Sequence, residues 1–308
     1  MTQTQKDRDA LREWAVFYES GLRRQNSDVN LTQAQIAKDR TRLEADPIEW
    51  IRFFFPEYCK FEFAEFQIKA IRRCIKHEEW FEVLSWARGL AKSTTVMFIV
   101  IYLALTKKKC NVMMASATQD SAVRLLDPYK KQLEENALIR AYYGVQVNLG
   151  NWCAEEFVAK CGCSFRAVGA GNAPRGSRNG AVRPDVLLVD DFDTDEGCRN
   201  PDTIDKNWTW WEKALYGTRD TAVKTLIVFC GNIIARDCCV VRAGHMADHW
   251  DVVNIRDEKG YSTWPSKNTE ESIDIALSKI STAAQQTEYF NNPVTEGEVF
   301  KEITYGKV

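Results

Sequence analysis

The sequence predicts an α/β fold in which a mostly parallel sheet is flanked by helices, after an N-terminal helical segment. Three observations lead to this prediction. Short apolar runs alternate with helical stretches from residue 81 onward, one run continues into Lys92-Ser93 and a long apolar helix, and another ends in Asp190-Asp191. Short runs rich in Val, Ile and Phe between helices are typical of βαβ units, whose parallel strands are buried on both faces.

The expected elements follow in order along the chain. Residues 1–46 are polar and helix-forming, and they are expected either to dock on the core or to serve as a free partner-binding arm. Asp46-Pro47 breaks this segment, and the domain built on the sheet is expected to span 47–295. The expected strands are 81–85, 111–116, 163–168, 185–190 and 225–230, and the expected helices are 65–77, 92–106, 119–138 and 201–215.

The first strand and helix of this pattern have the layout of a phosphate-binding loop: a strand, a tight turn with Gly89, then Lys92, a hydroxyl and a helix. In such a loop the backbone N–H groups and the helix N-terminus hold the phosphates, Lys92 neutralises the β and γ oxygens, and Ser93 ligates Mg²⁺. The expected nucleotide-binding residues here are Ala87, Arg88, Gly89, Leu90, Ala91, Lys92, Ser93 and Thr94.

The loop departs from the usual pattern Gly-x-x-x-x-Gly-Lys-[Ser/Thr] at two positions. Trp86 stands at the first glycine position and Ala91 at the second. An ordinary strand–turn–helix with a surface lysine is therefore the alternative interpretation of the loop alone.

A second apolar strand ends in the two acids Asp190-Asp191. In P-loop NTPases such a strand is expected beside the first one; its terminal carboxylate holds Mg²⁺ through water, and the next carboxylate orients or deprotonates the attacking water. We therefore expect Ser93 and Asp190 on the metal and Asp191 as the catalytic base. Together with Lys92, these acids favour a RecA/ASCE-like P-loop NTPase that hydrolyses ATP.

A third apolar strand ends in Cys230-Gly231-Asn232. In many motor ATPases a polar residue on the strand next to the magnesium-binding strand senses the γ-phosphate. Asn232 is the candidate for this role, and a simple turn at the end of the strand is an equally good interpretation of these residues.

Composition limits the classes of function. The chain has 308 residues and a formal net charge of −2, so any DNA contact must be a local patch and not a bulk basic field. No apolar run reaches about 18 residues and the N-terminus has no apolar signal region, which argues against a membrane span and a secretory signal. The ten cysteines are scattered without a Cys-x-x-Cys pair, which favours reduced thiols over a zinc site.

The motifs and their order resemble the large terminase subunit of tailed bacteriophages, over roughly residues 47–300. Arg88 and Lys92 have the spacing of the family's phosphate loop, which tolerates loss of the first glycine. The segment 175–191, from Arg-Gly-Ser-Arg through Arg-Pro-Asp to Asp-Asp, looks like the corresponding stretch of the family. Gln67 is similar to the glutamine that reads adenine.

The C-terminal part of the sequence adds to this resemblance and also departs from it. Cys230-Gly231-Asn232 stands where the family has a coupling motif, usually a small residue, Gly and Thr, and residues 262–265 and 288–293 resemble the stretch that leads out of the ATPase domain. Ala91 replaces a glycine and Asn232 replaces the threonine. Asp191 stands where many relatives have Glu, so Asp193 or Glu196 could act as the base instead.

The resemblance implies roles for three arginines. Arg88 lies in the phosphate loop and would stabilise the charge of the transition state in cis. Arg175 or Arg178 would do so in trans, from a neighbouring subunit in a ring. The alternative for Arg175 and Arg178 is a salt bridge to the acidic segment 190–196.

The function implied by the resemblance is ATP hydrolysis with Mg²⁺, coupled to translocation of viral double-stranded DNA into the prohead. The expected partners are the portal protein, the small terminase subunit and further copies of the chain in a pentameric ring, in the host cytoplasm and without a membrane. Residues 296–308 are expected to begin a linker to a nuclease domain that this chain lacks, so it is not expected to cut DNA. The alternatives are a nucleotide-binding assembly module with little turnover and a helicase-like DNA-dependent ATPase.

Overall fold

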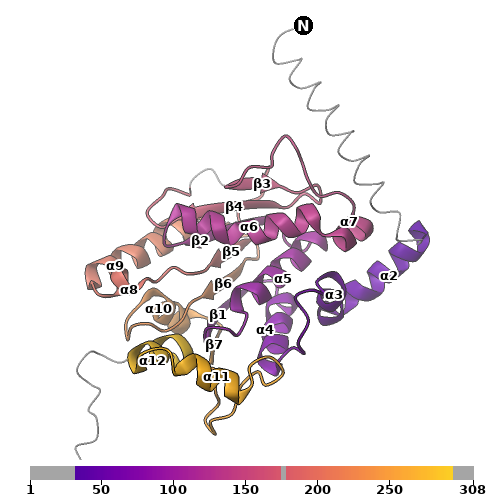
Figure 1. The fold of residues 1–308 in the computed structure, drawn as a ribbon. Coiled ribbons are helices and arrows are strands. Elements are labelled where there is room, and N and C mark those ends of the chain that lie inside the picture. Colours follow the sequence, from indigo (N-terminus) through magenta and orange to yellow (C-terminus); the bar gives the residue numbers. More distant parts are fainter. Residues whose placement is uncertain (1–31, 175–177, 294–308) are drawn as a thin grey trace, which may run out of the picture.

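The computed structural model describes residues 32–174 and 178–293. Within them a seven-stranded sheet has the order β3-β4-β2-β5-β6-β1-β7 (Figure 1). All neighbouring strands pair in parallel except β3 and β4. The strands are β1 (Trp80–Trp86), β2 (Asn111–Ser116), β3 (Glu156–Val158), β4 (Ser164–Gly169), β5 (Val186–Val189), β6 (Leu226–Cys230) and β7 (His249–Val253). The predicted α/β fold with a mostly parallel sheet is confirmed.

Helices cover both faces of the sheet, and alternate residues of the central strands enter two separate cores. Leu84 of β1 belongs to the core under the first set of helices, whereas Val83 belongs to the core under the second set. The first set comprises α2 (Gln33–Ala45), α3 (Pro47–Phe54), α4 (Glu65–Lys76), α5 (Lys92–Leu105), α6 (Gln119–Glu135) and α7 (Ala137–Tyr143). The second set comprises α8 (Asp195–Cys198), α9 (Pro201–Trp210), which continues through a π turn (Trp211–Leu215) and a 3-10 turn (Tyr216–Thr218), and α10 (Cys239–Met246).

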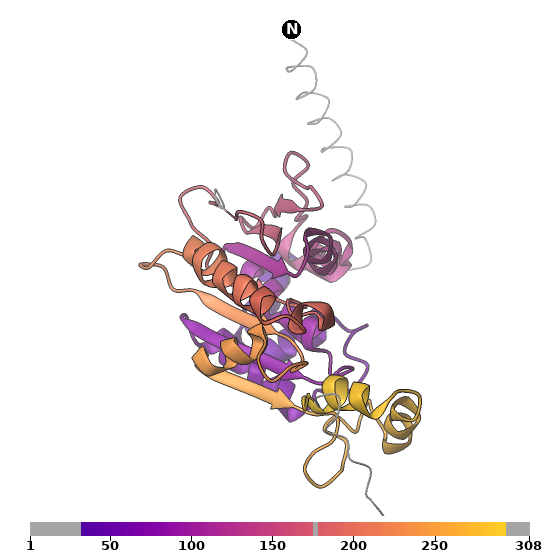
Figure 2. The ribbon, with the colours of Figure 1, turned by 90° about the vertical axis from the view of Figure 1, so that its left-hand side faces the viewer.

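Two further helices lie beyond these layers. Figure 2 shows α11 (Glu270–Leu277) and α12 (Thr282–Phe290) below the β7 edge of the sheet. Their connection to the sheet is direct, because the N–H of Ile255, just after β7, donates to the Tyr289 carbonyl over 2.9 Å. The C-terminal part of the described chain therefore reaches the carboxyl end of β7, at the edge of the sheet.

Local sequence explains where several helices begin and end. Asp46 caps α3 by accepting from Ile48 N–H, and Pro47 occupies the first helical position, so the predicted break at Asp46-Pro47 is confirmed. Helix α5 is apolar all round and is buried from Thr95 to Leu105, as expected for a helix enclosed by its neighbours. The expected helix over 119–138 divides at Asn136, whose side chain caps α7.

One expectation about the sheet is wrong. The strand that ends in Asp190 does not lie beside β1, because β6 is inserted between them and pairs with both. Strand β7 and helices α10 to α12 have no counterpart in the expected pattern. Strand β7 is a half-exposed edge strand, so its residues lack the continuous apolar character of a buried parallel strand.

Some expectations fall outside the described residues, namely those on 1–31, 175–177 and 294–308. They include most of the N-terminal segment and the linker 296–308, and the domain boundaries stay predictions. All ten cysteines lie within the described part and are free thiols. None of the described helices combines the length and apolar character that a membrane crossing requires.

Candidate functional site

The candidate site lies where the carboxyl ends of β1, β5 and β6 meet the first turn of α5 (Figure 1). The loop from Ala87 to Ala91 joins β1 to α5. Three of its N–H groups are already used: that of Ala87 donates to the Val253 carbonyl over 2.7 Å, that of Arg88 to the Glu288 carbonyl over 2.8 Å, and that of Leu90 to the Ala87 carbonyl over 3.2 Å. The first N–H groups of a helix have no partner within it, so the start of α5, with Lys92, supplies the free donors for an anion.

Ala91 takes the backbone conformation that glycine usually provides in this loop. It precedes α5 with φ 59° and ψ 36°, in the left-handed region. A side chain in that region costs about 1–2 kcal/mol. The N–H and the hydroxyl of Thr95 both donate to the Ala91 carbonyl, over 2.9 and 2.8 Å, and hold this residue in place. The loop thus keeps its turn although the glycine is replaced.

Lys92 and Ser93 contact the ends of the other two strands. The Lys92 ammonium donates to Oδ1 of Asn232, after β6, over 2.9 Å. The Ser93 hydroxyl donates to Oδ2 of Asp190, after β5, over 2.5 Å. The structure therefore brings together the predicted lysine, hydroxyl, first acid and amide, although Lys92 and Asn232 are 140 residues apart in the sequence.

Asp190 is a buried carboxyl with a perturbed pKa. Asp190 is 3 % exposed. Burial raises the pKa of Asp190 to about 6, Lys92 partly offsets this rise, and the neighbouring Asp191 carboxylate adds to it. A buried carboxylate beside a hydroxyl offers the hard oxygen ligands that Mg²⁺ prefers, and a divalent cation would compensate the buried charge. These residues fit a magnesium site.

The three acids proposed as catalytic base differ in what they contact. Asp191 has φ 48°, which is uncommon outside glycine, and its carboxylate is exposed beside Asp190. Asp193 is engaged elsewhere, because its two oxygens accept from the N–H groups of Cys239 and Val240 at the start of α10, over 2.9 and 2.8 Å. Glu196 lies exposed on α8. Of the three acids, Asp191 is thus the one that is exposed and directly follows the buried carboxyl of Asp190.

Gln67 connects the phosphate loop to α4. It is 1 % exposed, its Nε2 donates to the Leu90 carbonyl over 3.2 Å, and its Oε1 accepts from the Ala64 N–H over 2.9 Å. Both ends of the amide are bonded to backbone in this structure. Reading of adenine by Gln67 stays a prediction.

The three arginines lie in different surroundings. Arg88 is exposed and lies 3.5 Å from a carboxylate oxygen of Glu288. Arg178 is also exposed and lines a cavity of about 620 Å³ together with Arg183 and Lys213. Within residues 32–174 and 178–293, no ion pair joins Arg178 to the acidic segment 190–196. Arg175 falls outside the described residues.

Helix α12 contributes to the site in a way that residue types do not reveal. The Glu288 carbonyl accepts from the Arg88 N–H and from Nδ2 of Asn232, over 2.8 and 2.9 Å. Asn291, which follows α12, donates to the Ser85 carbonyl over 2.9 Å and accepts from the Ile233 N–H over 3.1 Å. The resemblance at 288–293 was the available signal for this segment. Nothing in the sequence marks Lys267, whose ammonium donates to the Gly89 carbonyl over 2.7 Å.

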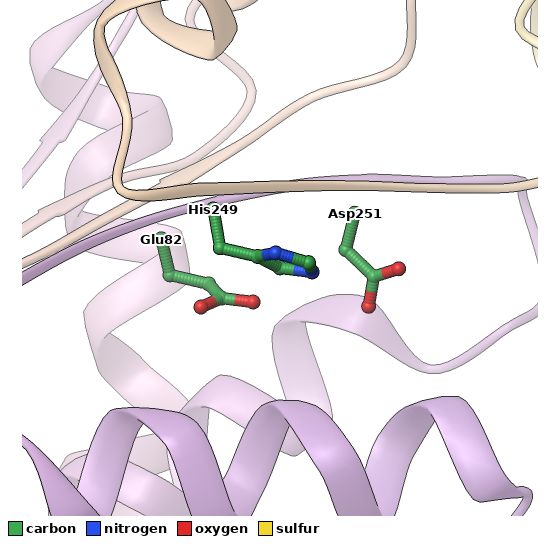
Figure 3. Close-up of side chains that lie close together, drawn as sticks. All are labelled: Glu82, His249 and Asp251. Carbon is green, nitrogen blue, oxygen red and sulfur yellow. The ribbon is translucent and has the colours of Figure 1, made fainter.

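A second group of polar side chains lies on the paired strands β1 and β7, where Arg73 of α4 contacts it. Oxygen and nitrogen atoms of Glu82, His249 and Asp251 lie within 4.8 Å of one another (Figure 3). The Arg73 guanidinium already neutralises this group, with contacts of 2.5 Å to Glu82 and 3.1 Å to Asp251. Trp80 Nε1 also donates to Glu82 over 2.6 Å. The group is therefore a buried ion-pair network and not a second metal site.

Comparison with known proteins places the fold. No protein-family model matches the chain, and no curated protein matches it in sequence. Among solved structures, the large terminase of bacteriophage HK97 is similar, with a TM-score of 0.55 and 12% identity over 81% of this chain and 55% of that one. The chain therefore spans about half the length of the HK97 protein. A point mutant of the large terminase ATPase domain of Thermus phage P74-26 has a TM-score of 0.45 and 15% identity over 75% and 94% of the two chains. The predicted resemblance to large terminase subunits is confirmed as a resemblance in fold.

Proposed function

We propose that this chain is an ATP-hydrolysing motor subunit that translocates viral double-stranded DNA into a prohead. The observation that carries the proposal is the pair of contacts Lys92–Asn232 and Ser93–Asp190. They join the start of one helix to the ends of two neighbouring strands, which is the arrangement that triphosphate and Mg²⁺ binding requires. The fold shared with the HK97 large terminase supports the link to packaging.

The proposed chemistry assigns one task to each group. Lys92 and the start of α5 hold the triphosphate, and Ser93 and Asp190 hold Mg²⁺, which neutralises charge that develops on the phosphates. Asp191 orients the attacking water and takes its proton. Arg88 stabilises the transition state within the subunit, and Arg178 or Arg175 does so from a neighbouring subunit.

The wider setting of the proposal follows the terminase resemblance. The chain acts as a pentameric ring in the host cytoplasm, docks on the portal protein at the prohead and receives DNA with the help of a small terminase subunit. It moves DNA and does not cut it. A helicase-like ATPase is less well supported, because the described residues form one sheet and not two RecA-type domains.

One observation favours a second candidate, a nucleotide-binding assembly module with little turnover. Both glycines of the usual phosphate-loop motif are replaced, by Trp86 and Ala91, and Ala91 is held in a left-handed conformation at a cost in free energy. The two candidates differ in a measurable way, since only the motor releases phosphate repeatedly.

Release of phosphate from Mg²⁺-ATP, with and without linear double-stranded DNA, tests the proposal. We expect turnover that DNA accelerates, and a loss of about a thousandfold or more in Lys92→Ala, because this removes a positive charge at the transferred phosphate. Lys206→Ala, at an exposed position of α9, is the matched control and should retain turnover. Near-wild-type turnover in Lys92→Ala would rule out the phosphate loop, and nucleotide binding without turnover would favour the assembly module.

A further inference from the structure

A small cavity opens between the phosphate loop and the two C-terminal helices. It has a volume of about 160 Å³ and is lined by Arg88 and Gly89 on the loop side, and by Asn268, Ile273 and Tyr289 on the other. Its loop residues lie three and four positions before Lys92. The cavity is therefore next to the place where the phosphates of a nucleotide are proposed to bind.

Asn268 is the unusual residue of this cavity. Its Nδ2 atom is buried and has no hydrogen-bond partner among residues 32–174 and 178–293. Its backbone is fixed, because its N–H donates to the Trp264 carbonyl over 2.9 Å. A buried amide that lacks a partner is costly, so its retention needs an explanation such as a ligand that pairs with it.

The remaining walls are suited to a flat apolar ring. Ile255 and Ile273 are 3 % and 4 % exposed and form an aliphatic surface. Tyr289 lines the same cavity and is half-buried. The volume is below the range of about 300–1,000 Å³ that is typical of sites for whole drug-sized ligands. It suits one heterocycle whose attached phosphates lie outside the cavity.

We propose that this cavity binds the nucleobase of the bound nucleotide and that the Asn268 amide reads adenine. This inference rests on the proposed ATPase function and assigns the base subsite within it. An asparagine amide pairs with adenine through one donor and one acceptor, at N6 and N7. Gln67, in contrast, has both ends of its amide bonded to backbone. Asn268 has the buried donor that a base would satisfy.

Two probes separate base binding from phosphate binding. The full chain is titrated in the presence of Mg²⁺ with a non-hydrolysable ATP analogue and with inorganic tripolyphosphate, which lacks a base. The variants are Asn268→Ala and Ala276→Phe, since Ala276 is an exposed residue of the cavity wall and a larger side chain there fills the space. Asn207→Ala on α9 is the matched control. The analogue is also compared with its guanine counterpart.

We expect both cavity variants to weaken binding of the ATP analogue at least about tenfold, because a paired buried group or the space for the ring is lost. Binding of tripolyphosphate should stay within about twofold, and Asn268→Ala should reduce the preference for adenine over guanine. Unchanged affinity for the analogue in both variants, or equal weakening of both probes, would overturn the base subsite. Wild-type protein that binds both probes equally tightly would overturn this subsite alone, whereas wild-type protein that binds neither would overturn the proposed function with it.

Discussion

The buried Asp190 carboxylate carries a cost in free energy that a cation in the site would offset. The carboxyl is buried, and its pKa of about 6 lies above the ordinary value of 3.8. The folded protein therefore binds this proton more tightly than the unfolded chain does. The stability that this proton contributes is complete below about pH 4 and is lost as the pH rises through about 6, with a total of about 3 kcal/mol.

Asp190→Asn removes this cost, because asparagine is neutral at every pH. Without nucleotide or metal, the variant should unfold at a higher temperature than wild type at about pH 8, and the difference should shrink toward zero at about pH 4.5. Its Mg²⁺-dependent turnover should be lost. Thermal unfolding at the two pH values checks the prediction. A variant that is less stable than wild type at the higher pH would show that Asp190 is not a strained buried charge.

The residues of the site could be predicted from the sequence to different degrees. Lys92, Ser93 and Asp190 have side chains whose chemistry is specific, and their placement at strand ends and a helix start follows from apolar patterns. The Glu288 carbonyl and the Lys267 ammonium also contact the site. A backbone carbonyl is present in every residue and one surface lysine resembles another, so neither could be predicted from residue types.

Asp193, two residues after the candidate base Asp191, holds the start of helix α10. Its carboxylate accepts from two N–H groups at the start of that helix, where a negative charge is stabilised by the helix dipole. Asp193 therefore has a structural role at the start of α10. These hydrogen bonds also distinguish Asp193 from Asp191, which the sequence alone could not do.

Asp193→Asn and Asp191→Asn should have opposite effects. The first removes one acceptor and the charge from the start of α10, so it should lower the free energy of unfolding by about 1 kcal/mol and leave turnover largely intact. The second should leave stability nearly unchanged and reduce turnover by about a hundredfold to ten-thousandfold, as for loss of a general base. Urea unfolding and steady-state phosphate release measure both. Loss of turnover in Asp193→Asn with full turnover in Asp191→Asn would reverse the assignment.

The strands could be predicted from the sequence where all of their residues are buried. The expected strand 111–116 coincides with β2, and 225–230 differs from β6 by one residue, because both strands are apolar and buried on two faces. Their order in the sheet was not predictable, since insertion of β6 between β1 and β5 depends on how the strands pair and not on the composition of each. Edge strand β7 lacks the apolar pattern that marks the others.

At the scale of the whole molecule, Arg178 lies in a cavity whose lining does not include Lys92, Ser93 or Asp190. Arg178 lines a basic cavity with Arg183 and Lys213. No contact among the described residues joins Arg178 to Lys92, Asp190 or Asp191. A subunit that keeps this arginine outside its own site can offer it to a neighbour in a ring.

Mixing two inactive proteins tests this arrangement. Asp191→Asn lacks the base and Arg178→Ala lacks the arginine, so each mixed ring contains some sites that receive both groups. We expect each variant alone to be slow, and their mixture under assembling conditions to regain part of the wild-type phosphate release. Arg183→Ala in place of Arg178→Ala is the control from the same cavity. A mixture no faster than its components would leave Arg178 as a structural residue.

The central claim is that Lys92, Ser93 and Asp190 form a nucleotide and magnesium site, and one measurement tests it most directly. It is the crystal structure of this chain with Mg²⁺ and a non-hydrolysable ATP analogue. We predict that the Lys92 ammonium leaves Asn232 for the β and γ phosphates and that Mg²⁺ lies about 2.1 Å from the Ser93 hydroxyl, with Asp190 beside it. A nucleotide bound elsewhere, with the Lys92–Asn232 and Ser93–Asp190 contacts unchanged, would contradict the claim.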